Sequence, residues 1–418
     1  MRMESPTFAD YTCARAPAEL ECRVRKTTKR HACSGNIRDR PPLNGRCAVA
    51  GGDGPNARTA PRRVLIHQWE FTGHRLKYVE ILTAYAVAHE MTVTLVLGPG
   101  AIESREYLTY LADLSNEVEA RTLPDASLRN LIKASRVSSA DQTLVPDGDA
   151  LAIRLGLRGA WRGHGELTLL IMRDPHRGTG VGLVPGLKAK LKAALIDRAA
   201  RRPGVRVLYL ESALTAATTK GGNRVSDPIT VASTDATTTA LRSDWGLDAD
   251  RYWFAVVGAI TSRKNIPLIA DALARATHPE RAGLLVAGLA EPDVRLDLET
   301  IAQGERSPGV HMVVVDRLLT DEELDSAISA TDCVVVAHSN EGPSGILGKA
   351  ACLGARVVAA GARSLERDVR VLGSAGCWVP LEVSELSRAF ARAMDSPRPA
   401  SSMAASTEDF TGQFFEYD

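Results

Sequence analysis

The stretch richest in chemically useful residue types is HSNEGPSGILGKAACLG, residues 338–354, which follows an apolar run. Gly342 and Gly345 permit backbone conformations that other residues resist. Ser344 can cap a helix that begins near Gly345, which leaves backbone N–H groups free to bind an anion. Glu341 lies just ahead of those donors, where its carboxylate can accept hydrogen bonds from hydroxyl groups. The pattern predicts a site for an anionic, hydroxyl-rich ligand; the alternative is that Glu341 only complements a helix dipole.

A lysine occupies an unexpected position in the same stretch. Lys349 comes eight residues after Glu341 and one helical turn past Gly345. We expect that face of the helix to point into the same crevice or to its rim. The sequence gives no reason for a cation at this position.

A second candidate site lies in VVGAITSRKNIPLIADAL, residues 256–273. Gly258 ends an apolar run, and Arg263 and Lys264 come just before a helix that Asn265 is expected to cap. Two cations beside a helix N-terminus predict an anion site. A solvated basic turn is the alternative for this stretch alone, but the two stretches together indicate a clamp for a diphosphate.

Two further turns follow apolar runs in the first half of the chain. FTGHRLKY places Gly73 and His74 at the start of a helix, without the spacing of a dinucleotide-binding fingerprint. VPDGDA places Asp147 and Asp149 where they could contact an acceptor or act as a base. For these two aspartates the sequence favours a surface turn.

Alternating apolar and amphipathic segments predict the elements that position these residues. Helical patterns separate the expected strands, which indicates parallel sheets and two successive α/β domains, residues 62–230 and 231–398. Ligands of such domains bind beyond the carboxyl ends of the strands, where all the candidate residues fall. VSDPI, residues 225–229, is expected to be a linker turn. The expected strands are 62–70, 91–99, 141–147, 167–173, 205–211, 251–260, 282–288, 310–316, 332–338 and 355–361.

The two ends of the chain differ from its middle. Residues 1–61 are expected to be a disordered basic extension, because residues 1–60 carry 11 Lys or Arg against 6 Asp or Glu. Residues 399–418 end in EDFTGQFFEYD, which predicts a short amphipathic segment that packs back on the body.

The composition narrows the function classes. The chain has 418 residues, is 44% hydrophobic and has a net charge of +1, which gives no case for nucleic acid. No apolar run reaches the roughly 20 residues of a membrane span, and no secretory signal is recognisable, so a cytoplasmic location is expected. The seven cysteines lack the close pairs of a zinc site, and no metal is expected. The basic helix 188–202 suits either a membrane surface or solvent, and the sequence favours solvent.

The ordered motifs GAITSRKN, LLVAG, DCVVVAHSNEGPSGILGKAACLGARVVA and LERDV resemble those of retaining nucleotide-sugar glycosyltransferases with the GT-B fold. The resemblance is to the glycogen-synthase-like and mannosyltransferase-like group. It covers residues 251–395 closely and residues 62–230 more loosely. It implies two tandem Rossmann-like α/β domains facing across a crevice.

The resemblance also implies roles for individual residues. Arg263 and Lys264 would bind the donor diphosphate, and Glu341 would hold hydroxyls of the donor sugar. The segment from Gly342 to Ile346 would approach sugar and phosphate, while Gly73 and His74 would lie near the acceptor. No metal or cofactor would be needed, since the nucleotide sugar is a co-substrate. The acceptor would be a glycan, a lipid-linked hydroxyl or a small-molecule hydroxyl.

The chain departs from the family pattern at the second Glu of the Glu-x7-Glu motif, which is Lys349. A carboxylate accepts hydrogen bonds from ribose hydroxyls, whereas an ammonium group only donates. Pro343 and Ser344 also replace the usual aromatic-glycine pair. Because of these departures, the chain could instead be a non-catalytic nucleotide-sugar-binding protein. A nucleotide-sugar epimerase is a further alternative. A phosphorylase that uses pyridoxal phosphate would need a Schiff-base lysine, which nothing in the sequence marks.

Overall fold

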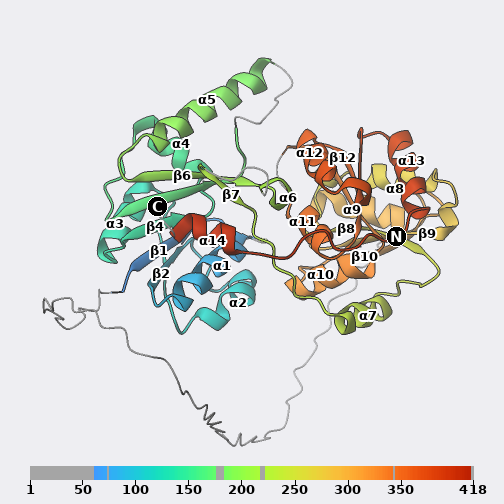
Figure 1. Ribbon diagram of the computed structural model, residues 1–418, viewed down its shortest axis with the longest axis horizontal. Coiled ribbons are helices and arrows are strands. Elements are labelled where there is room, and N and C mark those ends of the chain that lie inside the picture. Colours follow the sequence, from blue (N-terminus) through green and yellow to red (C-terminus); the bar gives the residue numbers. More distant parts are fainter. Residues whose placement is uncertain (1–60, 73–74, 176–182, 217–221, 342–343, 416–418) are drawn as a thin grey trace, which may run out of the picture. The chain divides into compact units, whose positions relative to one another are not determined.

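Two parallel β-sheets organise the chain in a computed structural model (Figure 1). The structure describes residues 61–72, 75–175, 183–216, 222–341 and 344–415, with side chains of 183–186 excepted. None of the helices in these ranges is long and apolar enough to cross a membrane.

The first sheet has seven strands in the order β3-β2-β1-β4-β5-β6-β7, with helices α1 to α6 between its strands. Every pair of neighbouring strands is parallel, as the alternation of strand and helix predicts. The strands are β1 (Arg63–Gln68), β2 (Thr92–Leu97), β3 (Glu119–Thr122), β4 (Gln142–Val145), β5 (Glu166–Ile171), β6 (Val205–Glu211) and β7 (Arg224–Ser226). The helices are α1 (Arg75–Ala88), α2 (Arg105–Tyr110), α3 (Leu128–Val137), α4 (Asp149–Arg158), α5 (Leu183–Ala200) and α6 (Ala213–Ala216).

The second sheet has six strands in the order β10-β9-β8-β11-β12-β13, again all parallel. Its strands are β8 (Tyr252–Val257), β9 (Ala282–Ala287), β10 (His311–Val315), β11 (Cys333–His338), β12 (Arg356–Gly361) and β13 (Gly376–Val379). The helices are α7 (Asp235–Asp244), α8 (Ile266–Ala274), α9 (Pro292–Ala302), α10 (Asp321–Ala330), α11 (Gly345–Cys352), α12 (Arg363–Val371) and α13 (Val383–Met394). Short 3₁₀ turns are η1 (Ala112–Leu114), η2 (Ser262–Lys264), η3 (Pro279–Arg281) and η4 (Gly373–Ala375).

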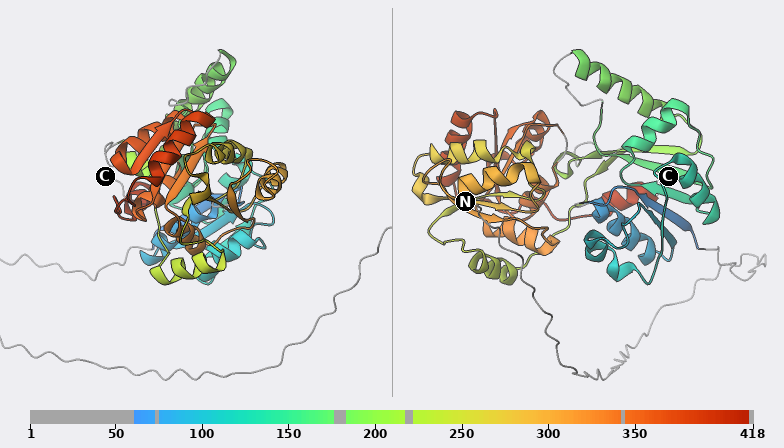
Figure 2. Two further views of the ribbon diagram at one scale, coloured as in Figure 1. Left: turned by 90° about the vertical axis from the view of Figure 1, so that its right-hand side faces the viewer. Right: turned by 180° about the vertical axis from the view of Figure 1, so that it is seen from behind.

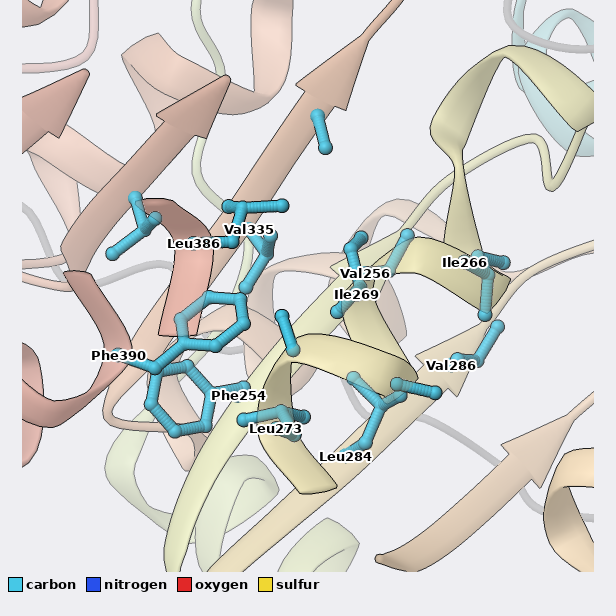
Figure 3. Packing of buried hydrophobic residues seen from close by; sticks show 14 of the residues in the cluster. Phe254, Val256, Ile266, Ile269, Leu273, Leu284, Val286, Val335, Leu386 and Phe390 are labelled. Carbon is cyan, nitrogen blue, oxygen red and sulfur yellow. The ribbon is translucent and has the colours of Figure 1, made fainter. Parts of the chain in front are cut away.

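Helices cover both faces of the second sheet, so its central strands are buried on both sides. On one face, α8 and α13 pack over β8, and the rings of Phe254 and Phe390 lie 4.7 Å apart between centroids (Figure 3). Trp253 points to the opposite face and joins a second apolar cluster. This two-sided burial explains why the strands read as continuous apolar runs.

Ten of these strands match segments predicted from the sequence, whereas β3, β7 and β13 were not predicted. β3 is an edge strand of four residues, EART, with little burial, and β7 has only three residues. β13 lies at the other sheet's edge and is only half-buried over most of its length. An edge strand can be short and polar because only one neighbour and little core constrain its sequence.

The C-terminal segment returns to the first sheet. Helix α14 (Glu408–Phe415) buries Phe410, Phe414 and Phe415 in the apolar cluster that also holds residues of α1 and β2. The rings of Tyr78 and Phe410 stack 5.3 Å apart. The C-terminal helix therefore completes the core of the domain in which the first sheet lies.

Candidate functional site

A cavity of about 640 Å³ lies where strands of both sheets end at their carboxyl edges. Its wall includes Asp147 after β4, Arg173 after β5, Gly258 after β8 and His338 at the end of β11. Parallel strands bring the residues that follow them to one edge of the sheet, so positions far apart in sequence converge here. The volume is in the range of small-molecule binding sites, about 300–1,000 Å³.

A basic turn forms one wall of this cavity. Lys264 is only 7% exposed, and its ammonium group donates to the carbonyl of Val257. Burial, followed by the charge of Arg263, lowers the pKa of Lys264 to about 7. Near pH 7 this lysine is therefore present in both its charged and its neutral form. An anion that binds beside it favours the charged form.

Asn265 fixes this turn by an arrangement that the sequence did not predict. It occupies the N-cap position of α8 with φ 52°, but its side chain does not cap the helix. Its Nδ2 instead donates to Arg263 O at 2.8 Å and to Ala337 O at 2.9 Å. These two bonds tie the basic turn to β11.

Arg173 adds a third cation from the first sheet. Burial and the nearby charge of Arg173 lower the pKa of Arg263. Among the described residues, neither guanidinium group lies within ion-pair distance of a carboxylate. Burial and the neighbouring cations Lys264 and Arg263 hold the pKa of His338 at about 3, so this imidazole is neutral. The cluster creates a positive potential that suits a multiply charged anion.

Glu341 lies in the cavity wall, and both of its carboxylate oxygens are engaged. They accept hydrogen bonds from Arg363 N at 2.9 Å and Ser364 N at 2.8 Å, at the start of α12. Burial acts to raise the pKa of Glu341, but these backbone donors outweigh it and the pKa is lowered. Glu341 therefore does cap a helix N-terminus, although that helix is α12 rather than the one that follows it. Each oxygen keeps a lone pair that can accept a further hydrogen bond.

The start of α11 agrees with the predicted position but differs in its capping. Ser344 is the N-cap residue, yet its side chain makes no capping hydrogen bond. Ser344, Gly345 and Ile346 all line the cavity. Gly258 faces Ile346, and its φ of +90° would strain any other residue. Gly342, like Gly73 and His74, lies outside the described residues.

Lys349 also lies in the cavity wall, where it neutralises a buried carboxylate. Its Nζ is 2.6 Å from Asp325 Oδ1 and donates to Thr230 O at 2.6 Å. The side chain of Asp325 is fully buried and accepts a further bond from Ala232 N at 2.8 Å. Lys349 thus ties α11 to α10 and to the segment that joins the two sheets, which answers why a cation occupies this position.

Asp227 belongs to the site, although the sequence indicated only a linker turn. It is 8% exposed, lines the cavity and accepts a hydrogen bond from the hydroxyl of Tyr78 at 2.8 Å. Burial raises the pKa of Asp227 to about 6, against the hydrogen bond from Tyr78 and the charge of Lys349. No local signal in VSDPI marks this role, because it arises from tertiary packing.

Asp147 and Asp149, for which the sequence favoured a surface turn, both line the cavity. Asp149 accepts a hydrogen bond from Met172 N at 2.9 Å and pairs with Lys192. Asp147 is 3.7 Å from Arg75 Nε, and burial raises its pKa. Within the described ranges, no group of three or more His, Cys, Asp or Glu side chains could hold a metal ion.

Comparison with known proteins identifies the fold. HepE from Anabaena, in complex with UDP and glucose, has 16% identity and a TM-score of 0.57, covering 85% of this chain and 95% of HepE. Sucrose-phosphate synthase from Thermosynechococcus elongatus has 15% identity and a TM-score of 0.58, covering 82% and 92%. WaaG, a glycosyltransferase of lipopolysaccharide biosynthesis, has 14% identity and a TM-score of 0.57, covering 80% and 90%.

The chain has the GT-B fold. The fold class implied by the sequence motifs is therefore confirmed. No protein-family model and no curated protein matches the sequence.

Proposed function

We propose that this protein is a glycosyltransferase that moves a sugar from a nucleotide-sugar donor to an acceptor hydroxyl. The observation that carries the proposal is the convergence of Arg173, Arg263 and Lys264 on one cavity at the carboxyl ends of both sheets. Three cations that form no ion pair with a carboxylate of the described residues suit a diphosphate. The shared fold with HepE, which binds UDP and glucose, supports this donor class.

In this proposal the diphosphate lies against the basic turn and the first turn of α11. Negative charge develops on the leaving diphosphate during transfer, and preorganised cations and backbone amides stabilise it there. Glu341, fixed by α12, accepts hydrogen bonds from hydroxyls of the donor sugar through its remaining lone pairs. We extend the proposal to retention of configuration and to a reaction that needs neither metal nor cofactor.

The acceptor would enter from the side of the first sheet, where Asp147 and Asp149 line the cavity. The acceptor would be a glycan, a lipid-linked hydroxyl or a small-molecule hydroxyl. Asp147 faces Arg75 at 3.7 Å in a loose contact. Its carboxylate therefore has the capacity to accept a bond from an acceptor hydroxyl.

A panel of nucleotide sugars, assayed for release of free nucleoside diphosphate, tests the proposal. We expect Lys264→Met and Glu341→Gln to lower the rate by about 10²–10³-fold, the cost of removing one group that stabilises developing charge. Lys133→Met, an exposed lysine of α3, is the matched control and should keep full activity. Wild-type rates in both site variants, with unchanged far-ultraviolet circular dichroism, would refute the assigned site.

One observation favours a second candidate, a nucleotide-sugar-binding protein without transfer activity. Lys349 is committed to Asp325, so position 349 offers no hydrogen-bond acceptor to a ligand. Calorimetric binding of a nucleotide sugar, with no turnover against any acceptor, would establish this function instead. Loss of that binding in Lys264→Met would still locate the ligand in the same cavity.

A further inference from the structure

A second basic feature lies on the domain of the first sheet, where α3, α4 and α5 end. It is a groove of about 760 Å³, and its wall contains no carboxylate. Apolar residues, among them Leu128, Ile132 and Leu157, form the rest of the wall. The arginines that line it are Arg129, Arg136, Arg158, Arg162, Arg198 and Arg202. We call it the arginine groove.

The arginine groove lacks its own counter-ions. In the part of the chain that the structure describes, none of its six guanidinium groups forms an ion pair. Arg136, Arg158 and Arg198 lie in the last turns of α3, α4 and α5, where each complements a helix dipole. That role accounts for one arginine per helix and leaves the other three unexplained. Like charges held together repel, so an external anion would stabilise the cluster.

Helix α5 continues this basic surface with exposed apolar residues. Leu187 is 70% exposed and Leu191 is 60% exposed, and both lie on the solvent face that also carries Arg198. Lys188 and Lys190 lie between the two leucines in the sequence and are exposed as well. The opposite face, with Ala193 and Ile196, packs on the domain. Figure 2 shows α5 at the outer side of this domain.

We propose that the arginine groove and the solvent face of α5 dock the protein on an anionic membrane surface. Arginines and lysines near such a surface are attracted by the acidic headgroups. Leu187 and Leu191 then leave water for the boundary of the acyl chains, as the apolar residues of interfacial helices do. A soluble anion would use the arginines alone and would leave both leucines exposed. The combination of charge and exposed leucines therefore favours lipid.

Helix α5 also connects this surface with the cavity. Lys192, about 100° around the helix axis from Leu191, lines the cavity and pairs with Asp149. A membrane held by α5 would thus lie near the side from which we expect the acceptor. This consequence rests on the proposed function, whereas membrane docking itself does not.

Sedimentation of the full chain with lipid vesicles tests the docking surface. We expect binding to vesicles that contain phosphatidylglycerol, and no binding to pure phosphatidylcholine. Arg158→Glu/Arg198→Glu should weaken binding about thirty-fold or more, from roughly fivefold for each basic residue at the surface. Leu187→Ser/Leu191→Ser should also weaken it, while both variants keep their nucleotide affinity.

Matched control variants distinguish the effect of the proposed docking surface from the effect of a changed net charge. Arg275→Glu/Arg281→Glu changes the charge equally on the other domain, and Leu296→Ser alters a leucine that is also 70% exposed. Both should bind vesicles as the wild type does. Equal losses in the control variants, or full binding by Arg158→Glu/Arg198→Glu, would overturn the proposal. Binding that is weakened by the arginine variant, unchanged by the leucine variant and abolished by inorganic polyphosphate would also overturn it, and would assign the groove to a soluble polyanion.

Discussion

Replacing Lys349 by Met tests whether this residue neutralises Asp325. The change removes the ammonium group 2.6 Å from Asp325 Oδ1 and leaves a carboxylate that is fully buried. Breaking a buried ion pair by removing one partner costs about 3–5 kcal/mol, because the remaining charge is unpaired. Thr230 O also loses its donor. We expect the free energy of unfolding to fall by an amount in this range.

Urea denaturation of Lys349→Met, Asp325→Asn and the double variant measures the pair directly. Asp325→Asn removes the charge but keeps an acceptor for Ala232 N, which donates to this side chain at 2.8 Å. If the pair is coupled, the double variant loses less stability than the sum of the single variants, by about 2 kcal/mol or more. Additive losses, or a loss below about 1 kcal/mol in Lys349→Met, would refute the assignment.

The pH dependence gives this prediction a second readout. Burial already raises the pKa of Asp325, against the charge and hydrogen bond of Lys349. Without Lys349 that pKa rises further, so the folded state binds more protons than the unfolded state above pH 4 or so. Stability then falls as pH rises through this window. The loss in free energy of unfolding of Lys349→Met, relative to the wild type, should therefore be smaller at pH 5 than at pH 7.5.

Three further predictions concern other parts of the molecule. Because the pKa of Lys264 is about 7 in the free protein, nucleoside diphosphate affinity should fall above pH 7, by up to about tenfold per pH unit. Calorimetry should show proton uptake on binding, and Lys264→Arg should abolish it. Burial raises the pKa of Asp227 to about 6, so the folded state binds more protons here than the unfolded state does. The free energy of unfolding of the wild type should therefore fall by up to about 3 kcal/mol as the pH rises from 4 to 6. Asp227→Asn should lack this loss in urea denaturation. Phe414→Ala should cost about 3–5 kcal/mol, measured in the same way, because the ring is fully buried in the core of the first domain.

The sequence predicts this fold well where burial is two-sided. The central strands β1, β8 and β11 are almost entirely buried, so few residue types other than aliphatic ones fit them. Edge strands such as β3 meet no such restriction and could not be recognised. The basic turn at Arg263 and Lys264 was predictable because one local segment supplies the strand end and both cations.

The partners of the site residues were not predictable, because each contact joins segments far apart in the chain. Lys349 and Asp325 are 24 residues apart, and Tyr78 and Asp227 are 149 residues apart. Glu341 was expected ahead of α11, but only the packed structure brings the start of α12 to its carboxylate. Arg173 stands at a strand end like the other candidates, so that signal could have identified it.

The distribution of charge around the cavity gives the strongest argument for the position of the ligand. Most charged side chains in its wall have a partner of opposite sign within the described residues: Asp149 with Lys192, Lys77 with Asp321, Lys349 with Asp325, and Arg75 with Asp147. Arg173, Arg263 and Lys264 form no such ion pair in the same set of residues, and all three line the cavity. Burial and repulsion by a neighbouring cation lower the pKa of Lys264 and of Arg263. Their charged forms therefore destabilise the protein when no ligand is bound. A ligand that brings two negative charges to this wall removes that cost, and its binding should therefore stabilise the fold by mass action.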